Sequence, residues 1–122
     1  MSRKVLLDEN LPHKLRAVLT ELDVSTVQYM GWAGKKNGEL LGLAEAAGFD
    51  VLVTGDKTLH FEQDMRERKI AVVSLSAPHW SIIKDDVGKI ALAIEEVQPG
   101  TLMRIYVGSF SRSRNLPSPP NP

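Results

Sequence analysis

Five short apolar runs alternate with segments of helical periodicity, and this alternation constrains the fold more than any other feature. Strands are expected over residues 4–8, 24–28, 49–54, 70–75 and 102–107. Apolar residues recur at helical spacing over residues 11–22, 37–47 and 81–97, and a further short helix is expected over 61–68. Strands that alternate with helices are typical of α/β domains, so the sequence predicts an α/β fold with a mostly parallel central sheet.

Capping signals and charge refine these elements. Asn10 and Asn37 are good N-caps, Pro12 suits a first helical turn, and Gly48 suits a helix C-terminus. The run at 70–75 contains no charged residue, which is typical of an interior strand, and the run at 102–107 is expected at a sheet edge.

The totals favour one soluble domain. The chain has 122 residues and no cysteine, which excludes disulfides, thiolate zinc sites and cysteine nucleophiles. Residues 1–107 are expected to form the domain, and residues 108–122, with four prolines and four serines, a disordered tail. No apolar stretch is long enough for a signal peptide or a membrane span, so we expect a cytoplasmic protein with no membrane partner.

Acidic residues stand at three positions where strands end or helices begin. Asp8, with Glu9 beside it, follows the first strand, and Asp56 follows the third strand. Glu39 stands in the first turn of the helix that Asn37 begins. The carboxyl ends of parallel strands meet in one crevice of such a sheet, so these carboxylates are expected to crowd together.

Crowded carboxylates repel one another unless a cation lies between them, and hard divalent cations prefer oxygen ligands. A pair of such cations can polarise both the attacking water and the leaving oxygen of a phosphodiester. We therefore expect Asp8, Glu39 and Asp56 to be catalytic metal ligands for Mg²⁺ or Mn²⁺. No organic cofactor is indicated.

The sequence around these acids resembles a known family. The runs VLLDENLP (residues 5–12) and VLVTGDK (residues 51–57) resemble motifs of small PIN-like nuclease domains. The run GWAGKKNGELL (residues 31–41) resembles the middle motif of a PIN-like group of unknown function that is similar to the VapC-type toxins. The motifs occur in the family's order over residues 4–107.

This resemblance implies a three-layer α/β/α sandwich and a Mg²⁺- or Mn²⁺-dependent endoribonuclease that hydrolyses RNA phosphodiesters. It further implies the toxin role of a toxin–antitoxin pair, with an antitoxin protein as partner and a homodimer as the assembly. Asp8, Glu39 and Asp56 match the family's metal-binding acids. The family commonly carries another acid just after the Thr-x-Asp motif, where this chain has Thr58 and Leu59. Glu9, Glu62 and Asp64 are the substitutes that the chain offers.

Basic and aromatic residues near the acids are candidates for substrate contacts. Lys57 follows Asp56 directly, and Lys35 with Lys36 precedes Glu39, so we expect these lysines to contact the RNA backbone. Tyr29 and Trp32 are candidates for stacking on an unpaired base, and packing against the sheet edge is the alternative for Trp32.

Two other functions remain open. A response-regulator receiver domain also has an acidic pair after its first strand and a phosphate-accepting aspartate after its third, here Asp56. It requires a hydroxyl after the fourth strand, for which Ser74 and Ser76 are available, and a lysine after the fifth, which this chain lacks. The second alternative is a catalytically inactive PIN-like module that binds a partner.

Overall fold

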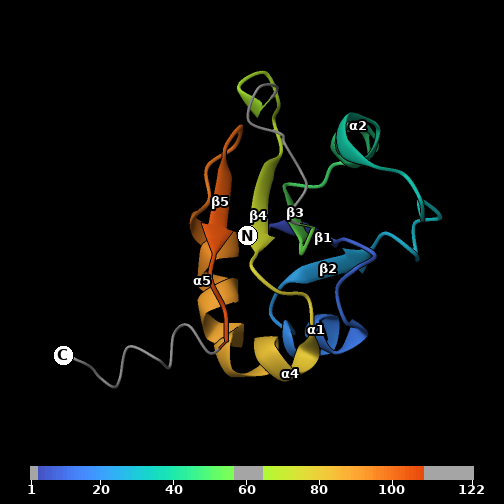
Figure 1. Ribbon diagram of the computed structural model, residues 1–122. Coiled ribbons are helices and arrows are strands. Elements are labelled where there is room, and N and C mark those ends of the chain that lie inside the picture. Colours follow the sequence, from blue (N-terminus) through green and yellow to red (C-terminus); the bar gives the residue numbers. More distant parts are fainter. Residues whose placement is uncertain (1–2, 57–64, 109–122) are drawn as a thin grey trace.

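The computed structural model describes residues 3–56 and 65–108, which form a five-stranded sheet with helices packed against it (Figure 1). The strands are β1 (Lys4–Leu7), β2 (Asp23–Thr26), β3 (Val51–Thr54), β4 (Ala71–Leu75) and β5 (Leu102–Ile105). Their order across the sheet is β2-β1-β3-β4-β5, and every neighbouring pair is parallel. This confirms the predicted α/β class, with β4 inside the sheet and β5 at an edge.

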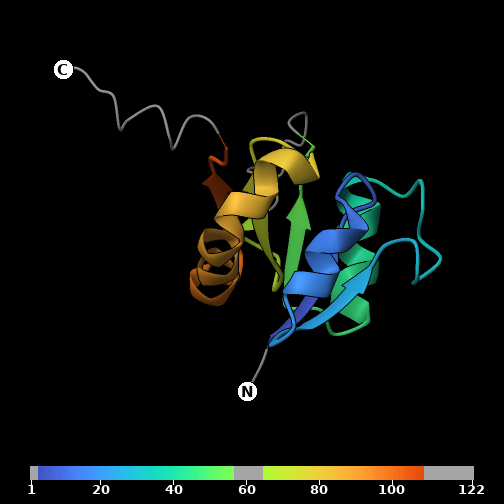
Figure 2. The same ribbon diagram turned by 90° about the horizontal axis from the view of Figure 1, so that it is seen from below.

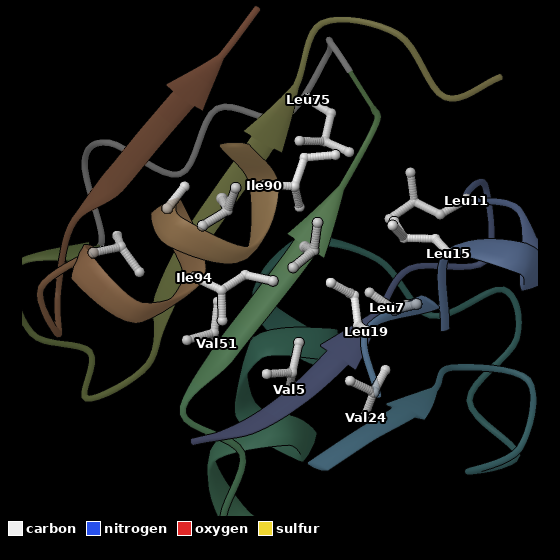
Figure 3. Close-up of a cluster of buried hydrophobic side chains, with 14 of the residues drawn as sticks. Val5, Leu7, Leu11, Leu15, Leu19, Val24, Val51, Leu75, Ile90 and Ile94 are labelled. Carbon is white, nitrogen blue, oxygen red and sulfur yellow. The ribbon is translucent and has the colours of Figure 1, made fainter. Parts of the chain in front are cut away.

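Helices pack against both faces of the sheet because the interior strands are apolar on both sides. On one face, Val5, Val51 and Val73 meet α1 (His13–Val18), α4 (Trp80–Ile83) and α5 (Val87–Glu96) in a buried cluster, part of which Figure 3 shows. On the other face, Leu6 and Leu52 meet the residues of α2 (Asn37–Ala46). We refer to these as the α5 face and the α2 face.

The last crossover has the opposite hand to the first two. The connection from β1 to β2 and the connection from β4 to β5 both cross the α5 face, but they move toward opposite edges of the sheet. The β2–β3 connection moves toward the β5 edge on the α2 face, so its hand matches that of β1–β2. In Figure 2 the strands point upward, β5 lies to the left of β4, and α5 lies in front of them, which makes this crossover left-handed. Right-handed crossovers are almost universal in parallel sheets.

The helix predicted over residues 81–97 is interrupted. It consists of α4, a 3₁₀ turn η1 (Lys84–Asp86) and α5. Asp86 has φ −121° and ψ 21°, outside the helical region, and its Oδ2 accepts a hydrogen bond of 2.7 Å from the Gly108 N–H. The helix therefore breaks at the residue that accepts a hydrogen bond from the chain after β5. Apolar periodicity alone does not reveal this break.

The N-caps of two predicted helices are other residues than expected. Pro12, not Asn10, occupies the N-cap of α1, and the Asn10 side chain accepts a hydrogen bond from the Gly55 N–H. Lys36 occupies the N-cap of α2, which begins at Asn37. The predicted C-terminus of this helix is confirmed, since Gly48 follows the C-cap with φ +87°.

Some predictions lie outside the described residues. These are most of the helix over 61–68, the side chains of Lys57, Glu62 and Asp64, and the tail beyond residue 108. Within the described residues, no helix is long and apolar enough to cross a membrane.

Candidate functional site

Asp8 and Asp56 lie at the carboxyl ends of the two strands where the chain order reverses. From β1 the chain proceeds to β2 on one side, and it later returns to β3 on the other side of β1. In open parallel sheets, ligands bind beside the carboxyl ends of the strands at this reversal. Asp8 directly follows β1, and Asp56 follows β3 by two residues. The structure therefore brings these two predicted site residues to the expected place.

The hydroxyl of Thr54 connects the two aspartates. Its Oγ1 donates a hydrogen bond of 2.7 Å to Asp8 Oδ2 and accepts one of 3.1 Å from the Asp56 N–H. Thr54 is fully buried, so this hydroxyl has little freedom to move. Asp8 Oδ1 accepts a further hydrogen bond of 2.7 Å from the Glu9 N–H, which fixes the orientation of the carboxylate.

The environment of Asp8 disfavours its charge. Burial raises the pKa of Asp8 above its ordinary value of 3.8, and the nearby charges of Glu9 and Asp56 raise it further. The hydrogen bonds from Thr54 and from the Glu9 N–H oppose this rise without cancelling it. A carboxylate held in this state is stabilised when a cation binds, because the cation offsets both the burial and the repulsion.

The chain between Thr54 and Asp56 passes through a narrow space. A Cβ on Gly55 would lie 2.9 Å from Pro78 Cβ and 3.3 Å from Leu11 Cδ2. The Gly55 N–H donates a hydrogen bond of 3.1 Å to Asn10 Oδ1. Gly55 and Asn10 thus fix the direction in which the chain leaves β3 toward Asp56.

Glu9 holds a neighbouring loop and does not join the aspartates as a ligand would. Its Oε1 accepts a hydrogen bond of 2.9 Å from the Gly34 N–H, and its backbone oxygen accepts one of 3.3 Å from Gln28 Nε2. Gly34 has φ +88°, a conformation that favours glycine. Glu9 therefore links the residues after β1 to the loop that carries Lys35 and Lys36.

Glu39 stands apart from Asp8 and Asp56. Its carboxylate forms an ion pair of 3.2 Å with Lys35, and its side chain is 61% exposed. Within residues 3–56 and 65–108, no three His, Asp or Glu side chains are grouped closely enough to hold a metal ion. In this conformation the structure thus unites two of the three predicted ligands.

The residues predicted to contact the substrate lie in different surroundings. Lys35 is paired with Glu39, Lys36 is exposed, and Lys57 lies outside the described residues. Trp32 is half-buried and packs edge-on against Phe49, with ring centroids 6.1 Å apart, which agrees with the packing alternative. Tyr29 is 82% exposed and borders a hollow of about 470 Å³ along the β2 edge, which His13 and Arg16 also line.

Three features of the site were not predicted from the sequence: the Thr54 hydroxyl, the Asn10 hydrogen bond and the contact of Glu9 with Gly34. Thr54 gave a signal that could have been used. It is the last residue of an otherwise apolar strand, and the residue that lies beside it at the end of β1 is Asp8. The other two contacts connect loops that are distant in sequence, and no local pattern announces them.

Comparison of the chain with protein-family models, with curated proteins and with solved structures finds no match.

Proposed function

We propose that this protein is a metal-dependent ribonuclease of PIN-like type, with Asp8 and Asp56 as the centre of its active site. The observation that carries the proposal is the pair of aspartates joined by the buried Thr54 hydroxyl at the reversal point of the sheet. A buried carboxyl with a raised pKa in such a crevice is a candidate functional group with a physical rationale. The PIN-like three-layer arrangement is part of the same proposal.

The donor set suits a hard divalent cation such as Mg²⁺ or Mn²⁺. Each oxygen of Asp8 accepts one hydrogen bond and keeps a free lone pair, and a second carboxylate stands two residues beyond Thr54. Glu39 would complete the set after release from Lys35. A bound cation would supply polarisation of the phosphoryl oxygen and neutralisation of developing charge.

The protein's own residues then have defined roles. Thr54 holds Asp8 in place, Glu9 holds the loop with Lys35 and Lys36, and these lysines with Lys57 position the RNA backbone. In the reaction, a water molecule gives up a proton to solvent as its oxygen forms a bond to phosphorus, the bond from phosphorus to the leaving ribose oxygen breaks, and that oxygen takes up a proton from solvent. The assignment to RNA, to a toxin–antitoxin pair and to a dimer rests on the motif resemblance.

The receiver-domain alternative is disfavoured by the fold. Receiver domains share the strand order 2-1-3-4-5, and with right-handed crossovers their β4–β5 connection covers the face opposite to that of the first helix. Here that connection lies on the same face as α1. Ser76 Oγ accepts a hydrogen bond of 2.9 Å from the Val107 N–H, and no lysine follows Lys89 in the sequence.

An inactive binding module is the second candidate, because the Lys35–Glu39 ion pair withholds one acid from the site. One experiment separates the two. Labelled single-stranded RNAs of mixed sequence are incubated with Mn²⁺ and wild-type protein, Asp56→Asn, or Glu67→Gln. Glu67 is an exposed acid beside β4, so its variant controls for the loss of one negative charge.

The proposed nuclease predicts cleavage by the wild type and by Glu67→Gln, abolished by EDTA and by Asp56→Asn. Cleavage that persists in Asp56→Asn would assign the activity to another site or to a contaminant. RNA binding by the wild type without cleavage in any divalent metal would instead support the inactive module.

A further inference from the structure

The acidic site continues across the sheet as a row of polar residues. Leu7 pairs with Val53, so the next position places Asp8 beside Thr54, as their hydrogen bond requires. Thr54 pairs with Ser74, and Ser74 pairs with Arg104 on β5. An acid, two hydroxyls and a base therefore occupy neighbouring positions on four adjacent strands at the carboxyl end of the sheet.

These side chains share the α2 face. Leu52 and Val72 belong to the cluster on this face, so Thr54 and Ser74, two residues further along each strand, lie on it as well. Leu102 borders the same cluster, whereas Met103 and Ile105 pack on the opposite face. Arg104 therefore projects from the α2 face.

The left-handed crossover leaves Arg104 accessible. A right-handed connection from β4 to β5 would cross the α2 face, but α4 and α5 lie on the other face. Arg104 is accordingly exposed, and no ion pair joins it to a carboxylate within residues 3–56 and 65–108.

Ser74 supplies an independent observation. It is only 2% exposed, and its Oγ has no hydrogen-bond partner within the part of the chain that the structure describes. A buried hydroxyl without a partner costs free energy that an apolar side chain would avoid. Its position, between the hydroxyl that holds Asp8 and the exposed guanidinium, is where a ligand oxygen or a bridging water would satisfy it.

The row has a length suited to RNA. Neighbouring strands lie about 4.8 Å apart, so three spacings separate the backbones at Asp8 and Arg104 by roughly 14 Å. A short stretch of single-stranded RNA spans this length. Guanidinium groups bind phosphate oxygens with two parallel hydrogen bonds, which makes arginine well suited to the far end of such a row.

We propose that Arg104, with the hydroxyl of Ser74, forms a phosphate-binding subsite that anchors the RNA strand beside the Asp8–Asp56 site. The subsite rests on the proposed function, since it takes its substrate from it. It assigns a role to an arginine that no sequence motif singles out.

The test measures binding without cleavage. Fluorescence anisotropy follows a labelled single-stranded RNA of about 12 nucleotides, within the usual range for single-strand sites, in a Ca²⁺ buffer at several salt concentrations. The proteins are wild type, Arg104→Ala, Ser74→Ala and Arg66→Ala. Arg66 is exposed near Gly100 at the opposite end of the strands, so its variant removes the same charge away from the row.

We expect Arg104→Ala to weaken binding on the order of tenfold and to reduce the slope of log K against log salt by about 0.7, the loss of one phosphate contact. Ser74→Ala is expected to weaken binding several-fold with no change of slope, and Arg66→Ala to match the wild type. Wild-type affinity in either Arg104→Ala or Ser74→Ala would overturn the shared subsite.

Failure of the subsite and failure of the proposed function give different results. If the wild type cleaves RNA and Arg104→Ala binds as Arg66→Ala does, the nuclease stands and the subsite is wrong. If the wild type neither binds nor cleaves RNA, both proposals fall together.

Discussion

Thr54 is the residue through which β3 determines the geometry of the acidic site. Its buried hydroxyl is shared between the Asp8 carboxylate and the Asp56 N–H, so one side chain positions both acids. The proposed metal site therefore depends on a residue that carries no charge and that would not itself bind the cation.

Thr54→Val is expected to destabilise the protein and to lower its rate of Mn²⁺-dependent RNA cleavage. Valine keeps the shape of threonine but leaves the Asp56 N–H and one Asp8 oxygen without their partner, which costs about 1–3 kcal/mol. Urea unfolding measures this cost, and Mn²⁺-dependent RNA cleavage measures its effect on the site. Thr54→Ser keeps the hydroxyl and serves as the control. Equal cleavage by the valine and serine variants would show that the hydroxyl does not organise the site.

Asp8 has a pH signature that can be measured without metal. Burial, together with the charges of Glu9 and Asp56, raises its pKa above 3.8 in the folded protein. The folded protein then binds more protons than the unfolded chain just above that pH, so the free energy of unfolding falls as pH rises through the folded pKa. In EDTA, Asp8→Asn is expected to be more stable than the wild type at neutral pH and to lose this advantage below pH 3.8. Urea unfolding at several pH values tests this, and parallel curves for the two proteins would contradict the raised pKa.

The path of the chain directly after β3 determines where Asp56 lies in the site. Gly55→Ala places a Cβ against Pro78 and Leu11, and such overpacking costs about 1–3 kcal/mol. Because Asp56 follows directly, we expect Mn²⁺-dependent cleavage to fall as well. Gly88→Ala in α5 is the matched control, since nothing lies within 4 Å of its added Cβ. That variant should gain about 0.4–1 kcal/mol and keep its activity. Thermal unfolding that ranks the two variants equally would refute the tight passage.

An ion pair and two hydrogen bonds join α2 to the segment before β4. Glu45 forms an ion pair of 3.0 Å with Arg68, and it accepts hydrogen bonds of 2.7 and 3.3 Å from the Lys69 and Ile70 N–H groups. Burial alone would raise the pKa of Glu45, but these hydrogen bonds outweigh it and lower the pKa below 4.5. The stabilisation is therefore present above the unfolded pKa and is lost as pH falls through the folded pKa.

Glu45→Gln is expected to cost about 1–3 kcal/mol at neutral pH, because charge-assisted hydrogen bonds are lost. It should also reduce the loss of stability on acidification, since the titrating group is gone. Denaturant unfolding from neutral to acid pH measures both effects, with Glu67→Gln as an exposed control. A wild-type pH profile in Glu45→Gln would assign the acid loss to other residues.

For the whole molecule, apolar patterning was sufficient to predict the class of fold and, over residues 3–56 and 65–108, the order of strands and helices along the chain. It could not predict the left-handed crossover, because Ala71–Leu75 is buried on both faces and so indicates no face for the next helix. The same limit hid Arg104, whose exposure depends on which face α4 and α5 cover. Asp8 and Asp56 were placed correctly because strand ends meet at one edge. Glu39 does not join them. Its place in the first turn of a helix does not determine where its long side chain points when a lysine is nearby.

Binding of Mn²⁺ by isothermal titration calorimetry tests the central claim most directly, with wild type, Asp8→Asn, Asp56→Asn and the control Glu67→Gln. The Asp8–Asp56 site predicts saturable binding by the wild type and the control. It also predicts a loss on the order of tenfold or more in each aspartate variant, because a hard cation depends on its few carboxylate ligands. Wild-type Mn²⁺ affinity in both aspartate variants would contradict the site.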